Sequence, residues 1–412
     1  MIPVPLKEGS SEGATAEFSA ETAKILKDRK IASVTPLGGG RYALRALLKV
    51  GAVRFPDLEL HIQPKLTISR LWFLLGFAYK GVESGWQEPE VSANEHPGLL
   101  PGVAHAFLRA TGKALPHGLP HGYRQESRAL PVVRGRIREA DQVRRQYGRL
   151  LPAEVTYHTF SVDTPETRLL RAATERLLQL PGVHPTVQVR LRELLPPLRR
   201  AASIPAGTIP AWRPSPANAH YRTALGLADL VLRGGSFEFH DDSGRAPLAV
   251  DGLLVGMDKV FEDFLEHALG GLLTRHGGVC EAQEREIHLD VERSWAMKPD
   301  IRWHEAGRTH AIIDAKYSGA KGEPEHRYQM VTYCAKFHSP QGHIVYAGGG
   351  RKPMIRRRIL SPRMELFNHR LDLASPIEEI RVQLEDIAQQ IITVAHAART
   401  RNRARTFRFG PP

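Results

Sequence analysis

An apolar segment that ends in a carboxylate and an ammonium group is the strongest constraint on how this chain can fold. Residues 311–313 are Ala-Ile-Ile, and Asp314, Ala315 and Lys316 follow them directly. A short apolar run of this kind predicts a buried β-strand. Because successive side chains of a strand point to opposite faces, Asp314 and Lys316 share one face. A carboxylate at the end of a buried strand is costly without a partner, so a partner is expected nearby.

A second carboxylate precedes this strand by one hairpin. Pro299 and Asp300 introduce residues 301–304, a further strand candidate, and a turn near Gly307 joins the two strands. This hairpin would place Asp300 almost opposite Asp314. Directly opposed residues have Cβ atoms roughly 4.5–5.5 Å apart, which lets two carboxylates share one divalent cation. The alternative is an ordinary edge hairpin with solvated surface charges.

The electrostatics of such a pair favour a bound metal ion. Two carboxylates about 5 Å apart repel each other by roughly 3 kcal/mol at an effective dielectric near 20. Unless one is protonated, a cation must offset that repulsion. Oxygen ligands favour Mg²⁺ or Mn²⁺, either of which activates water and neutralises charge developing on a phosphodiester. Lys316, on the same face, is placed to orient that water or to hold the phosphate. The pattern predicts a metal-dependent nuclease.

The composition is that of a soluble globular protein with two or three domains. The chain has 412 residues, of which 42% are hydrophobic and 25% are charged. The apolar run at residues 71–78 is too short to span a membrane, and the N-terminus lacks the plan of a signal peptide. Cys280 and Cys334 are the only cysteines, which excludes a disulfide framework and a cysteine-based zinc site. We therefore expect a cytoplasmic protein without a membrane partner.

The charge of the chain predicts a polyanionic partner. The formal net charge is +13 at pH 7. From Pro340 to Pro412, 13 Arg and Lys residues stand against 6 Asp and Glu residues, so this part holds more than half of the excess. One basic cluster is Arg351, Lys352, Arg356, Arg357 and Arg358, and a second is Arg399, Arg401, Arg403, Arg405 and Arg408. The first is predicted to bind DNA phosphates with salt-sensitive, sequence-independent affinity. The second is either a similar surface or a disordered basic tail.

The secondary-structure pattern indicates an α/β (α+β) fold. Helices are predicted over residues 71–79, 164–180, 225–232, 257–266 and 324–337, and strands over residues 58–63, 131–137 and 343–346. Thr164 is the expected N-cap of its helix, with Pro165 in the first turn. Ser375 opens a capping box that starts the last helix. Residues 1–30 are expected to be a weakly ordered lead-in with one short helix.

Short motifs recur in a fixed order between about residues 45 and 350. They are Leu-His-Ile-Gln-Pro-Lys at 60–65, Val-Arg-Gly-Arg at 133–136, Phe-Ser-Val-Asp-Thr-Pro at 160–165, Val-Phe-Glu at 260–262, Pro-Asp at 299–300 and Asp-Ala-Lys-Tyr at 314–317, followed by Gln329 and Tyr333. In this set the chain resembles the McrC family, the nuclease subunits of McrBC-type modification-dependent restriction systems. That family belongs to the PD-(D/E)xK nuclease superfamily. The nuclease motif is the specific part of the resemblance.

The resemblance implies a role for each matching residue. The family's catalytic positions would be Asp300, Asp314 and Lys316. Glu262 would match an acid on the first helix that helps to organise the metal, although a solvated helix acid is an equal alternative. Gln329 and Tyr333 would lie on a helix beside the active site, in a structural role or in contact with the substrate.

The resemblance also implies a division of labour along the chain. Residues 1–150 would form a β-rich domain that docks on a separate AAA+ GTPase, the McrB-like partner. Residues 151–250 would be a helical connector, and residues 251–412 the PD-(D/E)xK domain with a basic tail. GTP would act only through the partner, which agrees with the lack of a nucleotide-binding loop in this sequence. Thr167 stands where the family commonly has Asn, which puts the local helix cap in question.

These observations favour a Mg²⁺- or Mn²⁺-dependent DNA endonuclease subunit of a McrBC-like defence system, acting on modified double-stranded DNA. Two other hypotheses stay open. One is a stand-alone PD-(D/E)xK repair nuclease. The other is a non-catalytic DNA-binding adaptor that stimulates a partner NTPase.

Overall fold

The computed structural model describes most of the chain. The described residues are 3–78, 99–180, 183–205, 208–213, 215–234, 237–239, 248–282, 287–317, 324–348, 354–361 and 363–406. They divide into two compact units, one of residues 1–99 with 254–412 and the other of residues 100–253. This division differs from the one expected at residues 150 and 250. Composition along the sequence cannot show that the first 99 residues share a unit with the last 159, because that depends on tertiary contacts.

The N-terminal part of the first unit is built from two small sheets. β1 (Val4–Lys7), β6 (Glu59–Gln63) and β5 (Lys49–Arg54) are neighbours in one sheet, with β1 parallel to β6. β2 (Ala14–Glu17), β4 (Arg41–Ala46) and β3 (Ala32–Gly38) form the other. Helices α1 (Ala20–Asp28) and α2 (Ile68–Ala78) complete this part.

The expectation of a weakly ordered lead-in is wrong, although its short helix is confirmed. The side chains of Ile25 and Leu26 in α1 are 1% and 0% exposed. β1 is ordered because it pairs with β6, where Val4 lies beside Leu60. A four-residue strand whose partner lies more than 50 residues away leaves no local signal.

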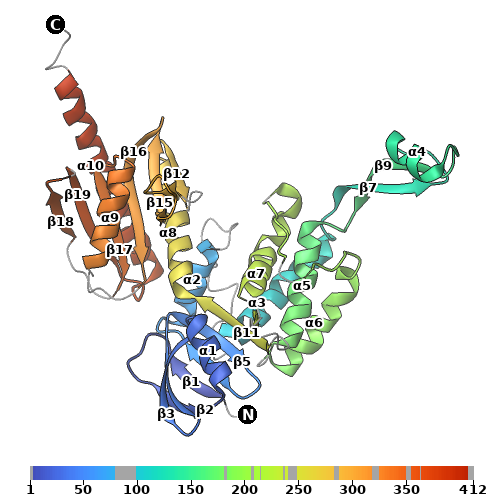
Figure 1. Cartoon of the computed structure of the whole chain (residues 1–412), viewed down its shortest axis with the longest axis horizontal. Helices are drawn as coiled ribbons and strands as arrows, with labels where there is room; N and C mark the ends of the chain where they lie inside the picture. Colours follow the sequence, from blue (N-terminus) through green and yellow to red (C-terminus); the bar gives the residue numbers. More distant parts are fainter. Residues whose placement is uncertain are drawn as a thin grey trace. The chain divides into compact units, whose positions relative to one another are not determined.

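The C-terminal part of the first unit is a six-stranded mixed sheet covered by helices. In spatial order its strands are β12 (Val279–Ala282), β15 (Ile301–Glu305), β16 (Arg308–Lys316), β17 (Gln341–Ala347), β19 (Met364–Leu371) and β18 (Ile355–Ile359). β16, β17 and β19 run parallel, and the outer pairings are antiparallel. The helices are α8 (Met257–Thr274), α9 (Pro324–Lys336) and α10 (Ile377–Thr406), and a two-stranded ribbon, β13 (Ile287–His288) with β14 (Ala296–Met297), precedes β15. Figure 1 shows this arrangement.

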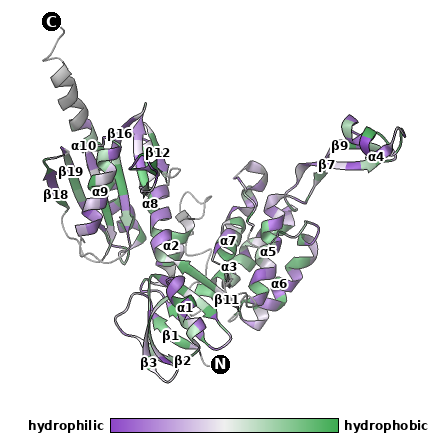
Figure 2. Ribbon diagram, viewed as in Figure 1, coloured by the Kyte–Doolittle hydropathy of each residue, from purple (hydrophilic) through white to green (hydrophobic). Residues whose placement is uncertain are grey.

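The two faces of this sheet carry different helices. Ile312, Ile344 and Leu366 on the strands pack with Met330 and Cys334 of α9 in one apolar cluster. On the opposite face Gln341 donates to the carbonyl of Ile391 in α10. The central strands are mostly hydrophobic in Figure 2, as expected for a sheet covered on both sides.

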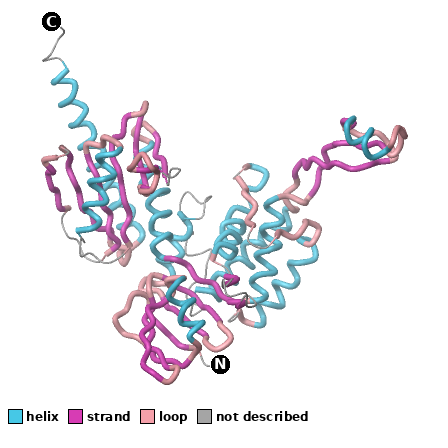
Figure 3. Tube along the Cα trace, in the orientation of Figure 1, coloured by secondary structure: helices cyan, strands magenta, loops and turns pink. Residues whose placement is uncertain are grey.

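The second unit is a group of helices with a long antiparallel ribbon (Figure 3). Its helices are α3 (Leu99–Ala114), α5 (Pro165–Gln179), α6 (Pro185–Leu198) and α7 (Arg222–Arg233), with short 3₁₀ turns at Leu115–His117 and Pro216–Tyr221. β7 (Gly122–Leu130) and β9 (Ala153–Ser161) form the ribbon, which also carries β8 (Arg136–Ile137) and α4 (Glu139–Gln146). β10 (Phe237–Phe239) pairs with β11 (Leu248–Gly256), which leads into α8.

Two local predictions in this unit have opposite outcomes. The cap of α5 is confirmed, because the side chain of Thr164 accepts a hydrogen bond from the backbone N–H of Thr167 at 3.2 Å. Thr167 therefore leaves the cap intact. The strand predicted over residues 131–137 is wrong except for its last two residues, since Gly135 adopts a φ of +77° and breaks the extended run.

Among the described residues, no helix is long and apolar enough to cross a lipid bilayer.

Candidate metal centre

A β-bulge sets the position of the two carboxylates. Next to the turn, Glu305 pairs with Arg308, but the register shifts between Trp303 and His304, so that Ile301 pairs with Ile313. One residue further out, Asp300 therefore lies opposite Asp314. A bulge adds one residue to one strand of a pair. If the register at the turn continued without it, Asp300 would lie opposite Ile313 and the two acids would point to opposite faces. The bulge thus places the two acids on the same face of the ribbon.

The turn of this hairpin was predicted near Gly307 and is confirmed there. Ala306 and Gly307 form the two-residue loop with φ of +48° and +78°. A two-residue loop with both φ values positive matches the right-handed twist of the flanking strands. The hairpin is therefore tight and holds β15 firmly against β16.

Hydrogen bonds fix the three predicted catalytic groups. The Oδ2 atom of Asp300 accepts from the backbone N–H of Ala315 at 2.7 Å. The Nζ atom of Lys316 lies 2.7 Å from Oδ2 of Asp314. Asp314 is 3% exposed, and the Lys316 side chain is 20% exposed, so the ammonium sits between the buried acid and solvent.

The proximity of the two acids changes their protonation. Burial, followed by the charges of Asp314 and Glu262, raises the pKa of Asp300 to about 8. Burial also raises the pKa of Asp314, although the charge of Lys316 opposes this. Burial alone would lower the pKa of Lys316, but the carboxylates outweigh it and raise the pKa above its usual value. At neutral pH without a cation, burial and mutual repulsion therefore favour a proton held within the pair.

This chemistry fits a hard divalent cation. A buried and a part-buried carboxylate whose joint ionisation is unfavourable gain most from a cation between them, and their oxygen donors suit Mg²⁺ or Mn²⁺. Among the residues that the structure describes, no group of three or more His, Cys, Asp or Glu side chains is arranged to hold a metal ion. The protein would thus supply two carboxylates and leave other positions to water and substrate, as is usual for Mg²⁺.

Glu262 is near this pair but belongs to another cluster. It lies on α8, and its charge contributes to the raised pKa of Asp300. Its closest charged partner is Lys259, at 3.5 Å. Burial raises the pKa of Glu262 itself. The structure therefore places Glu262 beside the centre without bringing it into a group with Asp300 and Asp314, and its metal role stays a prediction.

Helix α9 borders the centre, as expected from Gln329 and Tyr333. Gln329 donates from Nε2 to the hydroxyl of Tyr333 at 2.8 Å, and this hydroxyl lies 3.4 Å from the carbonyl of Lys298, to which it donates. Burial raises the pKa of Tyr333, and the charge of Asp314 adds to this effect. Tyr333 is therefore tied to the segment just before Asp300.

His326 is a neighbour of the centre that the sequence reasoning missed. It lies on α9 one turn before Gln329, and its charge acts to lower the pKa of Asp314. Its Nδ1 atom is 3.5 Å from the hydroxyl of Tyr346 on β17. The spacing of residues 326, 329 and 333 places all three on one helix face, a signal that could have found it.

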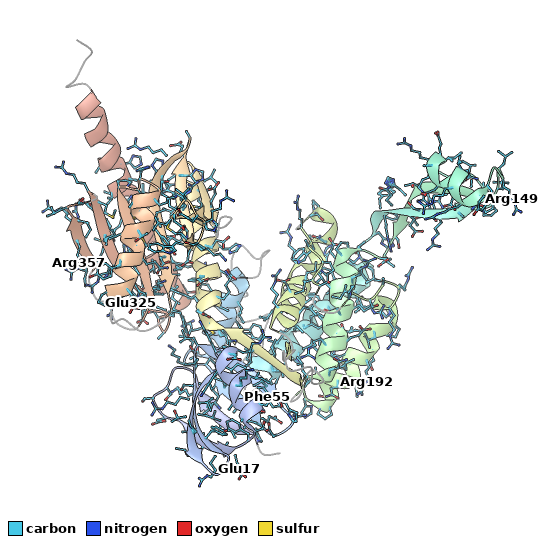
Figure 4. All side chains as sticks on the ribbon, in the orientation of Figure 1. Glu17, Phe55, Arg149, Arg192, Glu325 and Arg357 are labelled. Atoms are coloured by element: carbon cyan, nitrogen blue, oxygen red, sulfur yellow. The ribbon has the colours of Figure 1, made fainter. Side chains whose placement is uncertain are left out.

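The first basic cluster is split by the limits of the described residues. Arg351 and Lys352 lie outside them. Arg356, Arg357 and Arg358 are exposed on β18, the outer strand of the six-stranded sheet. Figure 4 labels Arg357 at this edge. Arg356 is paired with Glu365 at 2.7 Å, which leaves Arg357 and Arg358 as the less engaged cations. The second cluster falls outside the described side chains.

Comparisons with known proteins found a matching family model and similar solved structures. A family model described as "McrBC 5-methylcytosine restriction system component" matches residues 44–347. A chain of the solved half-complex from the tetradecameric assembly of Thermococcus gammatolerans McrB AAA+ hexamers with bound McrC has 17% sequence identity and a TM-score of 0.54. That match covers 95% of this chain and all of the other.

A second solved structure, the Thermococcus gammatolerans McrBC complex, contains a chain with 18% identity and a TM-score of 0.41, covering 69% of this chain and 90% of the other. No curated protein matches the chain. The first structural match supports the mixed α/β fold expected from the sequence.

Proposed function

Because this chain belongs to the family of McrBC 5-methylcytosine restriction system components, we propose that it is the DNA endonuclease subunit of such a system. The observation that carries the proposal is the pair of opposed acids, with the part-buried Asp300 just before β15, the buried Asp314 on β16 and Lys316 beside them. Nothing in an ordinary edge hairpin requires two carboxylates whose ionisation is mutually unfavourable.

Each of the three groups has a defined task in phosphodiester hydrolysis. Asp300 and Asp314 would hold a Mg²⁺ or Mn²⁺ ion. When bound, that ion supplies an activated water molecule and neutralises charge that develops on the phosphate. The raised pKa of Lys316 keeps its ammonium protonated at neutral pH, so it brings a fixed positive charge to the transition state.

The substrate would be double-stranded DNA, held partly by the exposed arginines of β18. Arg357 and Arg358 lie on the same sheet as the acids and are free of the pairing that occupies Arg356. With a net charge of +13, the chain would bind phosphates with a strong dependence on salt. A modified base as the trigger for cleavage is proposed from family membership alone.

The partner would be a McrB-like AAA+ GTPase, and GTP would act only through it. In the similar solved structure, McrC is bound to McrB AAA+ hexamers. The ribbon of β7 and β9 supports a docking role in this chain, because large apolar side chains near its end are exposed. Tyr147 is 90% exposed and Leu150 is 89% exposed. Exposed apolar side chains gathered at one place favour an interaction site.

Reconstitution with the partner tests this function. The reaction would contain the full chain, its McrB-like AAA+ partner, GTP, Mg²⁺ and either methylated or plain DNA. Asp314→Asn is the matched variant. We expect cleavage to fall by a factor on the order of 10³ in the variant, because the ion loses a ligand and its charge balance. DNA binding and stimulation of the partner's GTPase should be retained. Undiminished cleavage by Asp314→Asn would exclude this site, and no cleavage by either protein would favour the adaptor hypothesis.

A further inference from the structure

Within the described part of the chain, the end of β16 that carries the proposed centre has backbone pairing on one side only. The ladder with β15 stops where Ile301 pairs with Ile313. Beyond that point β16 is paired only with β17, where Asp314 lies beside Ile344 and Lys316 beside Tyr346. On the other side the hydrogen bond from Ala315 to Asp300 is a side-chain contact. The position of this end therefore depends on side chains that anchor it.

Tyr317, the next residue, is such an anchor. It points to the face of the sheet opposite to Lys316, because neighbouring side chains of an extended segment alternate. It is 5% exposed, and its ring centroid lies 6.0 Å from that of Phe261 on α8. Its hydroxyl is 3.5 Å from Oε2 of Glu8, and Nζ of Lys65 lies 4.7 Å from its ring centroid. Glu8 and Lys65, both from the N-terminal part of this unit, thus contact the residue that follows Lys316.

Glu8 and Lys65 are themselves held in place by the first sheet. Glu8 follows β1 and its N–H donates to the carbonyl of Gln63 at 2.9 Å. Its Oε2 atom accepts from the N–H of Lys65 at 3.2 Å, and its Oε1 atom lies 3.8 Å from Nζ of Lys65. The parallel pairing of β1 with β6 therefore brings residues 57 positions apart to one point. All of these residues and Tyr317 belong to the same compact unit.

The chemistry of this cluster is a poor choice for stability alone. The Glu8 side chain has no exposed area, and burial raises its pKa. A buried ion pair contributes little net stability compared with apolar side chains of similar size, because desolvation offsets its attraction. A directional contact between a cation, a carboxylate and a phenol does, however, fix the position of the phenol ring.

We propose that Lys65 and Glu8 are positioning residues for the metal centre, acting through Tyr317 on Asp314 and Lys316. This inference rests on the proposed function. It adds that the N-terminal sheet helps to fix the position of the end of β16. Loss of the Lys65 contact would therefore make Asp314 and Lys316 more mobile, although Lys65 acts on them only through Tyr317.

A pair of matched variants tests this coupling in the full-length chain. Lys65→Met removes the cation from Glu8, and Arg54→Met removes a cation from another buried acid of the same sheet, Glu59, which it meets at 2.8 Å. Of these two lysine and arginine side chains, Lys65 is the one that also contacts Tyr317, the residue after β16. Both variants would be measured for Mn²⁺ affinity by calorimetry and for hydrogen exchange at the amides of residues 314–317, with thermal unfolding as the measure of general stability.

The expected result is selective. Lys65→Met should weaken Mn²⁺ binding about tenfold, the lower end of what loss of an outer-shell support costs, and should speed exchange at residues 314–317. Arg54→Met should change neither. Tyr317→Phe, which keeps the ring and loses the contact with Glu8, should show a smaller effect in the same direction. Lys65→Arg should restore affinity, because arginine also stacks on an aromatic ring. The last two variants serve if Lys65→Met does not fold.

Other outcomes overturn the inference or the function separately. Equal effects of Lys65→Met and Arg54→Met on exchange and affinity would make the contact merely structural, and no effect of either would remove the coupling. If the wild-type chain binds Mn²⁺ in a way that Asp314→Asn abolishes, but cuts no DNA, the proposed function fails and the positioning role stands. If the wild type binds no Mn²⁺, the metal centre fails, and faster exchange only in Lys65→Met would still show the coupling.

Discussion

At the scale of residues, the opposed acids make ion binding depend on pH. Burial and the neighbouring charges raise the pKa of Asp300 to about 8 when no ion is present. Below that pH the ion must displace a proton. Affinity for Mn²⁺ should therefore rise with pH by up to about tenfold per unit below pH 8 and level off above it. Calorimetric titrations at pH 6, 7, 8 and 9 measure this slope.

Asp300→Asn is the control for that slope. It removes both the titrating group and one ligand, so it should bind Mn²⁺ weakly at every pH without the same rise.

The raised pKa of Asp300 also affects stability. Its contribution to the folded state is fully present below the pKa that an aspartate has in the unfolded chain, and it is lost as the pH rises toward 8. In metal-free protein the wild type should therefore lose stability relative to Asp300→Asn between pH 5 and pH 8. Parallel pH profiles of the two proteins would contradict the assignment.

Single residues also show how far sequence reasoning reaches. Asp314 and Lys316 could be placed on one face because strand periodicity is local and strict. Asp300 was placed almost opposite Asp314, yet the bulge at Trp303 and His304 that makes the opposition direct leaves no sequence signal of its own. His326 shares a helix face with Gln329 and Tyr333, a local signal, but its nearness to Asp314 depends on how α9 lies on the sheet.

At the scale of elements, the predictable parts are those with local signals. The capped helix at Thr164 and the helix at Pro324 begin where their capping residues and prolines indicate. β1, in contrast, exists because of a partner strand far along the chain. The strand expected at residues 131–137 failed at Gly135, where the close approach of β9 decides the conformation. The apolar pattern of that segment does not record this approach.

The ribbon offers an element-scale prediction at Gly135. Its φ is +77°, and a Cβ added there would collide with the backbone carbonyl oxygen of Thr156. Gly148 has a φ of +83° with nothing within 4 Å of the added Cβ. Gly135→Ala should therefore destabilise the ribbon by roughly 1–3 kcal/mol more than Gly148→Ala, because it adds a collision to the same backbone strain.

Hydrogen exchange at the amides of β9 measures this difference. Faster exchange is expected there in Gly135→Ala, with unchanged protection in α5. Mn²⁺ affinity should be unaffected, because the metal centre lies in the other compact unit. Equal exchange in the two alanine variants would show that backbone strain alone sets the cost.

At the scale of the whole molecule, the first unit is assembled from both ends of the chain. α2 lies against α8, with the rings of Phe73 and Phe264 5.7 Å apart, and Phe264 is fully buried. A fragment of residues 251–412, the division that the sequence suggests, would expose this face and lose the contacts of Tyr317 with Glu8 and Lys65. We expect it to unfold at a lower temperature and to aggregate, whereas co-expression with residues 1–99 should recover a folded complex. Calorimetry on both preparations decides this, and an equally stable lone fragment would contradict the division.

The net charge of +13 raises the question of whether DNA binding follows total charge or a particular surface. Arg357 is exposed on the outer strand of the six-stranded sheet, and Arg192 is exposed on α6 of the second unit. Changing either to alanine lowers the net charge by one. If β18 contacts phosphates, Arg357→Ala should reduce the slope of log affinity against log salt concentration by about 0.9, whereas Arg192→Ala should leave it unchanged. Fluorescence titrations of one duplex at several salt concentrations measure both slopes. Equal slopes in the two variants would mean that the charge acts as a diffuse field and that β18 is not a DNA contact.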